Sequence, residues 1–230
     1  MQRNVGSWFG KVVGWGMDVD VVTIDYGMGN LLSVKRGLEA AGAKVGITSK
    51  GSEIVSARRL ILPGVGAFGD GMKELRQRGL IQPINQYVNQ GRPLLGICLG
   101  MQMLFEKSLE FGEHVGLGYI PGVVQRIPGN EDGRMVRKIP HIGWNSLDSP
   151  KKKTIWNDTI LQGVGLEQTF YFVHSYMAVP ASIVNIQAVC EYDGLTIPAV
   201  VEKGSVVGCQ FHPEKSGPDG LAILARFLRL

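Results

Sequence analysis

Cysteine is scarce in this sequence, and long apolar runs are missing. The 230 residues include 3 cysteines, Cys98, Cys190 and Cys209, an odd and sparse set that argues against a disulfide framework. We therefore expect a reduced compartment, the cytoplasm. Every apolar run falls short of the ~18 residues that a membrane-spanning helix needs, so we expect no transmembrane helix.

A large excess of one charge is also missing. The chain has 24 lysines and arginines against 20 aspartates and glutamates, and the only dense basic run is Lys151-Lys152-Lys153. A nucleic-acid-binding surface needs a basic stripe, so we interpret this run as a solvated loop. We expect neither a nucleic-acid nor a membrane partner.

Glycine, in contrast, accounts for 32 residues without a repeat period, which indicates many tight turns. Residues 1–16 hold Trp8 and Trp15 but lack the continuous apolar centre of a secretory signal. We interpret them as an N-terminal extension of unknown role, either a loose tail or residues that precede a start at Met17. An amphipathic targeting peptide is an alternative. Residues 17–230 contain no long polar linker, so we expect one domain there.

The first half of the chain alternates between strand and helix patterns. The expected strands cover residues 19–24, 44–47, 59–62 and 93–97, and the expected helices cover 31–41, 70–78, 81–89 and 99–108. This alternation predicts a largely parallel sheet flanked by helices. Ligands bind at the carboxyl ends of such strands, so chemistry is expected after Leu62 and Ile97.

The second half consists of strand patterns joined by short turns. The expected strands cover residues 123–127, 169–176, 186–192, 196–202 and 205–211, and a last helix covers 218–228. Short turns favour antiparallel hairpins. The predicted fold class is therefore α/β, with a mixed, largely parallel central sheet and antiparallel strands in the C-terminal half.

The strongest chemical signal is Gly96-Ile97-Cys98-Leu99-Gly100, between an expected strand and an expected helix. It has the spacing of a nucleophile elbow with cysteine in place of serine. Glycine is needed on both sides because the turn crowds the backbone, and the helix N-terminus favours a thiolate. The N–H of Leu99 is placed to stabilise an oxyanion. A buried structural cysteine is the alternative, which the paired glycines disfavour.

A thiolate that attacks an acyl group needs a base, and His212 is the strongest candidate among 4 histidines. His212 and Glu214 lie two residues apart at a strand end, so we expect the carboxylate to orient the imidazole and complete a Cys–His–Glu triad. Without Cys98, an ordinary polar strand exit would explain both residues. We expect His174 to line the cleft from its strand.

The loop Pro63-Gly64-Val65-Gly66-Ala67-Phe68-Gly69 follows an expected strand and contains G-x-G-x-x-G. A dinucleotide-binding fingerprint also requires an acid about 20 residues further on, which is missing here. A nucleotide-dependent oxidoreductase is therefore the weaker interpretation. We interpret residues 64–66 as a flexible loop beside Cys98, with Gly64 and Val65 as sources of a second oxyanion N–H.

The remaining candidates have structural explanations. His114 and His141 have no partners at metal-ligand spacing, and Cys190 and Cys209 are expected in the core, so we expect no metal site. Trp144 lies in a stretch punctuated by glycine and proline, which predicts a loop. A core tryptophan is the default there, and an anchor for a partner protein is the alternative.

Six motifs together resemble a known family. GICLGMQ (96–102), HPEKS (212–216) and PGVGAFGD (63–70) are similar to the class I glutamine amidotransferases. IDYGMGN (24–30), PHIGWN (140–145) and YFVHSY (171–176) are similar to the glutaminase subunits of imidazole glycerol phosphate synthase. The resemblance covers about residues 18–230 and implies a flavodoxin-like glutaminase fold that uses no cofactor.

The resemblance implies that Cys98 attacks the carboxamide carbon of glutamine, that His212 transfers protons, and that water hydrolyses the thioester. It assigns the glutamine contacts to Gly66, Gln102, Glu110, Ser175 and Tyr176. Ammonia in this family passes into a (β/α)8-barrel cyclase that makes imidazole glycerol phosphate in histidine biosynthesis. We therefore expect a heterodimer, with Trp144, Tyr171 and Lys215 near the interface.

Two alternatives stay open. An amidotransferase subunit with the same fold and triad could supply ammonia to another acceptor, such as a sugar in surface-polysaccharide synthesis. A non-catalytic regulatory module could also keep the fold, although an intact triad disfavours it.

Overall fold

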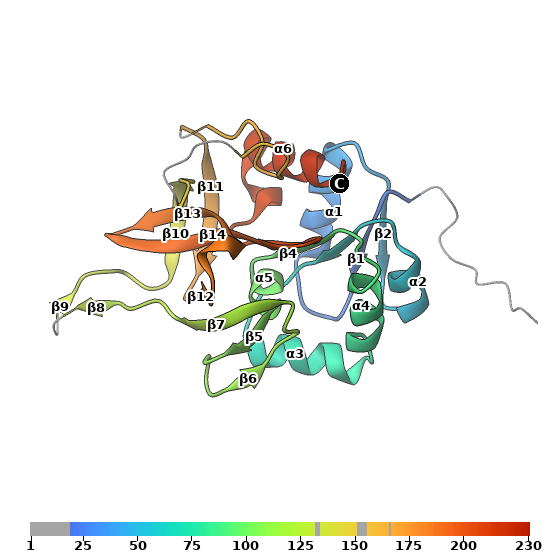
Figure 1. Ribbon diagram of the computed structural model, residues 1–230, viewed down its shortest axis with the longest axis horizontal. Helices are drawn as coiled ribbons and strands as arrows, with labels where there is room; N and C mark the ends of the chain where they lie inside the picture. The colour runs from blue at the N-terminus through green and yellow to red at the C-terminus, as the bar shows by residue number, and fades with distance from the viewer. Residues whose placement is uncertain (1–18, 132–133, 151–155, 166) are drawn as a thin grey trace, which may run out of the picture.

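The structure is a computed structural model that describes residues 19–131, 134–150, 156–165 and 167–230 (Figure 1). The expectations about residues 1–16 and about the lysine run 151–153 lie outside these residues. None of the described helices is long and apolar enough to span a membrane.

A seven-stranded sheet forms the centre, in the order β13-β14-β15-β4-β3-β1-β2 (Figure 1). The strands β1, β2, β3, β4 and β15 run parallel to one another, while β14 is antiparallel to both β15 and β13. Their bounds are β1 Val21–Ile24, β2 Val45–Thr48, β3 Leu60–Leu62, β4 Leu94–Ile97, β13 Ile186–Tyr192, β14 Leu195–Lys203 and β15 Val206–Cys209. The predicted mixed sheet is confirmed.

Helices cover both faces of this sheet because successive strand residues point to opposite sides. Ile61 packs into the cluster under α1 and α6, whereas Leu60 and Leu62 pack into the cluster under α2, α3 and α4. The helices are α1 Leu31–Ala40, α2 Gly51–Ser56, α3 Phe68–Gln77, α4 Ile81–Val88, α5 Leu99–Met103 and α6 Gly217–Phe227. The side chain of Asn30 caps α1 by accepting from the N–H of Ser33 at 3.2 Å.

Smaller sheets lie beside the carboxyl ends of the parallel strands (Figure 1). A four-stranded sheet has the order β12-β7-β5-β6, and β10 pairs with β11. Their bounds are β5 Phe105–Ser108, β6 His114–Val115, β7 Ile120–Arg126, β8 Asn130–Glu131, β9 Arg134–Met135, β10 His141–Ser146, β11 Thr169–His174 and β12 Tyr176–Pro180. Short 3-10 helices cover Ile183–Asn185 and Pro213–Lys215. These sheets build one side of the site described below.

Three predictions about these elements are wrong. The helix expected over 99–108 ends at Met103, because Phe105 and Ser108 bury their side chains as members of strand β5. The strand expected over 169–176 splits at Ser175 into β11 and β12, which pair with different partners. Trp144 lies on strand β10 rather than in a loop. The short helix α2 was not predicted.

Candidate active site

Cys98 stands at the junction between β4 and α5, where the backbone makes a strained turn. Its φ is +54°, in the left-handed region that side chains other than glycine rarely occupy. The flanking glycines are required: a Cβ on Gly100 would lie 1.8 Å from the carbonyl O of Leu62, and one on Gly96 would lie 2.7 Å from the carbonyl O of Gly100. The geometry is that of a nucleophile elbow.

His212 and Glu214 form a buried pair beside this junction. The Nδ1 of His212 lies 2.8 Å from Oε1 of Glu214. Glu214 reaches the ring from the 3-10 helix Pro213–Lys215. The two residues are therefore not aligned by the strand alternation expected from the sequence. A glycine in α1 makes room for Glu214, since a Cβ on Gly37 would lie 2.9 Å from Cβ of Glu214.

The charge state of His212 follows from its neighbours. Burial alone lowers the pKa of the imidazole, whereas hydrogen bonds to Cys98 and Glu214, with the attraction of their negative charges, raise it to about 9. The ring therefore carries a second proton at neutral pH. An imidazolium next to a cysteine sulfur stabilises the thiolate that acts as a nucleophile.

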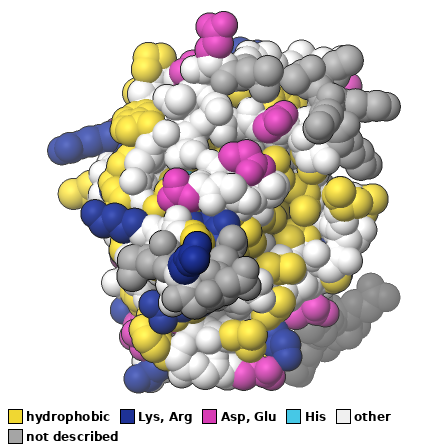
Figure 2. All heavy atoms as spheres, turned by 90° about the vertical axis from the view of Figure 1, so that its left-hand side faces the viewer, with side chains coloured by type: hydrophobic (Ala, Val, Ile, Leu, Met, Phe, Trp, Pro, Cys, Tyr) yellow, Lys and Arg dark blue, Asp and Glu magenta, His cyan; other side chains and the backbone are white. Residues whose placement is uncertain are grey.

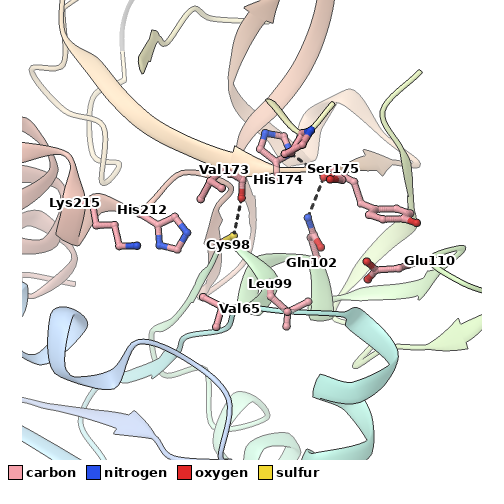
Figure 3. Close-up of a pocket in the computed structure, with 13 residues that line it drawn as sticks. Val65, Cys98, Leu99, Gln102, Glu110, Val173, His174, Ser175, His212 and Lys215 are labelled. Carbon is pink, nitrogen blue, oxygen red and sulfur yellow. Dashed lines mark hydrogen bonds between the residues drawn. The ribbon is translucent and has the colours of Figure 1, made fainter. Parts of the chain in front are cut away.

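A cavity of about 380 Å³ opens onto Cys98 and His212. Figure 3 shows Cys98 between His212 on one side and Gln102 on the other, with Val65 and Leu99 below. The five residues expected to contact glutamine all line the cavity: Gly66, Gln102, Glu110, Ser175 and Tyr176. His174 and Lys215 also line it. Residues from both halves of the sequence thus meet in one site.

The loop after β3 is packed against the elbow. Tyr26 donates from its hydroxyl to the carbonyl O of Pro63 at 2.7 Å. A Cβ on Gly64 would lie 2.6 Å from the Tyr26 hydroxyl and 2.9 Å from the N of Gly100, so this glycine permits the close approach. Of the three residues expected to supply oxyanion N–H groups, Val65 and Leu99 line the cavity, whereas Gly64 is not among its lining residues.

Sequence reasoning missed Gln210. Its side chain is fully buried, and its Nε2 donates to Sγ of Cys98 at 3.8 Å. Gln102 donates from its Nε2 to Oε1 of Gln210 and to the carbonyl O of Tyr176, each at 3.0 Å. The signal that could have found it was a polar residue directly after the apolar run 206–209, two positions before His212.

The other candidates fall into two groups. Cys190 and Cys209 are buried as expected. Within the described ranges, which include His114 and His141, there is no group of three or more His, Cys, Asp or Glu side chains that could hold a metal ion. His141 instead lies 3.0 Å from His174, a neighbour that the sequence did not suggest.

A surface patch centred on two aromatic rings lies next to the cavity. We call it the aromatic patch and define it as Trp144 and Tyr171 with the neighbouring side chains of Ile142 and Lys215. Trp144 is 55% exposed and its ring centroid lies 5.8 Å from that of Tyr171. The Nζ of Lys215, which lines the cavity, lies 6.0 Å from the centroid of the Tyr171 ring. Figure 2 shows the left-hand side of Figure 1, where hydrophobic side chains are interspersed with charged ones of both signs.

Comparisons with known proteins agree with this geometry. The family model for glutamine amidotransferase class-I matches residues 22–230. "Imidazole glycerol phosphate synthase subunit HisH 1" of Legionella pneumophila (strain Lens) is 50% identical over 91% of this chain and 99% of its own length. The subunit HisH of Syntrophotalea carbinolica is 46% identical over 90% of this chain and 98% of its own length.

A solved structure shares the fold at lower identity. The structure of PurLQS from Thermotoga maritima has a TM-score of 0.66 and 20% identity, and the match covers 91% of this chain and 97% of that one. The family match over almost the whole described chain and the identity to full-length relatives lead to one conclusion: the chain belongs to the class I glutamine amidotransferase family.

Proposed function

We propose that this chain hydrolyses glutamine to glutamate and ammonia, with Cys98 as nucleophile, His212 as proton carrier and Glu214 as the group that orients His212. The observation that carries the proposal is the shared cavity: Cys98 and His212 both line it, and the buried carboxylate of Glu214 lies 2.8 Å from the far nitrogen of the ring. This arrangement has the parts of a nucleophile–base–orienter triad.

The reaction follows from these positions. The Cys98 thiolate attacks the carboxamide carbon of glutamine and forms a C–S bond, and the carbonyl oxygen becomes an oxyanion. The His212 imidazolium gives a proton to the departing nitrogen, so the C–N bond breaks and ammonia leaves a glutamyl thioester. His212 then accepts a proton from water, whose oxygen attacks the thioester carbon. The C–S bond breaks, the new carboxyl group loses its proton as glutamate leaves, and the Cys98 thiolate and His212 imidazolium are restored.

Two backbone N–H groups are proposed to stabilise the oxyanion. The N–H of Leu99 follows the nucleophile at the start of α5, and Val65, which follows Gly64 in the loop after β3, lies on the same side of the cavity (Figure 3). One such donor is worth about 2.7–4 kcal/mol of activation free energy in enzymes that form a comparable oxyanion.

Glutamine has an ammonium and a carboxylate that need partners at the other end of the cavity. Glu110 is buried and one of its carboxylate oxygens accepts from the N–H of Phe68 at 2.6 Å. Its negative charge makes it the proposed partner of the substrate ammonium. Gly66, Gln102, Ser175 and Tyr176 line the same cavity as Glu110 and Cys98 and complete the proposed substrate contacts.

The ammonia acceptor is proposed from the relatives. The two relatives described above are named as subunits of imidazole glycerol phosphate synthase, and identities of 50% and 46% over nearly their whole length support the same role here. We therefore propose that this chain supplies ammonia for histidine biosynthesis, in the cytoplasm, as a heterodimer with a (β/α)8-barrel cyclase. The aromatic patch is the proposed docking surface, since exposed tryptophan and tyrosine are frequent anchors of interfaces.

An assay of glutamate release tests this function. With glutamine and the barrel cyclase carrying its own ligand, we expect glutamate and imidazole glycerol phosphate to form in equal amounts, because the cyclase consumes the ammonia. The control is the same mixture with asparagine, which is one methylene shorter. Absence of glutamate release in the complete mixture would refute the proposal.

The docking surface gives a second expected result. Replacing Trp144 by alanine should weaken binding of the barrel cyclase about 30-fold, because a central tryptophan contributes about 2 kcal/mol to an interface. Titration calorimetry measures the dissociation constant. Val115 is also exposed and apolar but lies on β6, outside the aromatic patch, so Val115→Ala is the matched control and should bind normally. Equal affinities of the two variants would show that the aromatic patch is not the docking surface.

A further inference from the structure

A chain of hydrogen bonds runs from the central sheet to the cavity through two histidines. The Nδ1 of His174 lies 2.8 Å from the carbonyl O of Tyr176, and its Nε2 lies 3.0 Å from Nδ1 of His141. The Nε2 of His141 lies 2.9 Å from Oδ1 of Asn145, whose Nδ2 donates to the carbonyl O of Glu191 at 2.7 Å. The chain therefore ends at a carbonyl oxygen on both sides.

Neutral side chains supply too few N–H protons for the hydrogen bonds of this network. Four contacts lie between the two terminal carbonyl groups, and each needs one N–H. Two neutral imidazoles supply one ring N–H each, and the Asn145 amide donates on one side only. Exchanging the amide O and N moves the shortage from His141 to Glu191 and does not remove it. One additional proton completes all four hydrogen bonds.

The surroundings favour placing the additional proton on His141. Its ring is stacked between two aromatic rings, with centroids 5.0 Å from Phe172 and 4.0 Å from Tyr192, and the faces of such rings attract a cation. Burial lowers the pKa of His141 overall, while the bond to Asn145 and the carboxylate of Asp193 act in the opposite direction, so the hydrogen-bond count and not the pKa carries the placement of the proton.

His174 is the less favourable position for that proton. Burial, with repulsion from His141 and His212, lowers the pKa of His174 to about 3, although its hydrogen bond to the Tyr176 carbonyl acts in the opposite direction. Charging both rings is excluded for the same reason. The four contacts therefore call for one proton beyond the neutral state of the pair, and not two.

We propose that the His141–His174 pair holds three ring protons, with the positive charge on His141, and that His141 is thereby a positioning residue for the segment Ser175–Tyr176. The second half of this inference rests on the proposed function, since both residues of that segment line the cavity next to Cys98. The charge-assisted bonds fasten this segment to strand β10 and, through Asn145, to β13 of the central sheet.

Histidine ring ¹⁵N chemical shifts test the proton count without any reference to activity. In the full-length chain labelled at its histidines, at pH 7, we expect His141 to be protonated on both nitrogens and His174 to be the neutral Nδ1–H tautomer. We expect His212, whose pKa is raised to about 9, to be doubly protonated as well, so a His212→Asn sample identifies its signals. Two neutral rings at positions 141 and 174 would overturn the proposal.

Asn145→Ala gives the sharpest variant. It removes the acceptor for His141 Nε2, so the remaining contacts need only the two protons of neutral rings, and His141 should lose its second ring proton at pH 7. Tyr192→Phe is the matched control, because it keeps the stacked ring and should keep the charge. A His141 imidazolium that persists in Asn145→Ala would contradict the inference even if that variant folds normally.

Kinetics with the barrel cyclase separates positioning from general damage to the fold. In Asn145→Ala we expect the KM for glutamine to rise about tenfold, equivalent to the ~1.4 kcal/mol of one charge-assisted hydrogen bond, with kcat changed much less. Tyr192→Phe should leave both constants unchanged. A fall in kcat at unchanged KM would overturn the positioning role. If the wild-type complex hydrolyses no glutamine, the proposed function fails while the ring-proton count is still decided by the spectra.

Discussion

Replacing Cys98 by alanine should abolish glutamine-dependent turnover of the complex and leave turnover with added ammonium salt intact. Removing the nucleophile of a catalytic triad lowers kcat by a factor on the order of 10⁴ to 10⁶. Free ammonia needs no thioester, so a barrel cyclase supplied with it does not depend on the sulfur. Imidazole glycerol phosphate formation, measured once with glutamine and once with ammonium chloride, gives both values.

The chain provides a matched control in Cys190. This cysteine is buried on strand β13, away from the cavity, and burial raises the pKa of its thiol to about 12, so it is not a nucleophile at neutral pH. Cys190→Ala should keep glutamine-dependent turnover. Survival of that turnover in Cys98→Ala would mean that another group attacks glutamine, and the assignment of the triad would be wrong.

Gly100→Ala is expected to have the largest effect on stability. The new Cβ would lie 1.8 Å from the carbonyl O of Leu62 and 3.3 Å from the carbonyl C of Pro63, and both are backbone atoms that no rotamer change can move away. Overpacking and strain of this kind belong to the class of substitutions that cost more than about 4 kcal/mol. Chemical denaturation gives the free energy of unfolding, and we expect glutaminase activity to be lost with it.

Gly165 allows a direct comparison, because a Cβ added there would meet no atom within 4 Å and its φ is ordinary. Gly165→Ala should change the free energy of unfolding by less than about 0.5 kcal/mol. If Gly100→Ala were as stable as Gly165→Ala, the elbow would tolerate a side chain, and the tight packing of β3 against α5 could not be what holds Cys98 in place.

The elements with strong local signals were predictable from the sequence. Short apolar runs marked the parallel strands, two of them ending at the turn residues Asp25-Tyr26-Gly27 and Pro63-Gly64, and the glycines around Cys98 marked the elbow. The helix expected after Cys98 failed past Met103 because apolar periodicity in a short window does not separate a helix from a buried strand. Pairing with β7 decides the structure of residues 105–108, and that pairing is not local.

Contacts between distant strands could not be predicted. His141 and His174 are 33 residues apart and meet because β10 and β11 pair in an antiparallel register that places them opposite each other. Gln210 touches Cys98 only because β15 lies next to β4 in the sheet. A single sequence carries no direct signal for either register. The sequence did indicate Glu214 as the hydrogen-bond partner of His212. The expected reason was strand alternation, whereas in the structure a 3-10 helix brings Glu214 to the ring.

The anchoring of Cys98 by main-chain atoms has a consequence for how this chemistry can change. Its N–H donates to the carbonyl O of Cys209 at 2.7 Å, its carbonyl O accepts from the N–H of Gln102 at 3.1 Å, and glycine at position 100 fixes the approach of β3. None of these contacts uses the sulfur. The position of residue 98 is therefore fixed by main-chain contacts. A different side chain at this position would occupy the same place in the site and would bring its own reactivity.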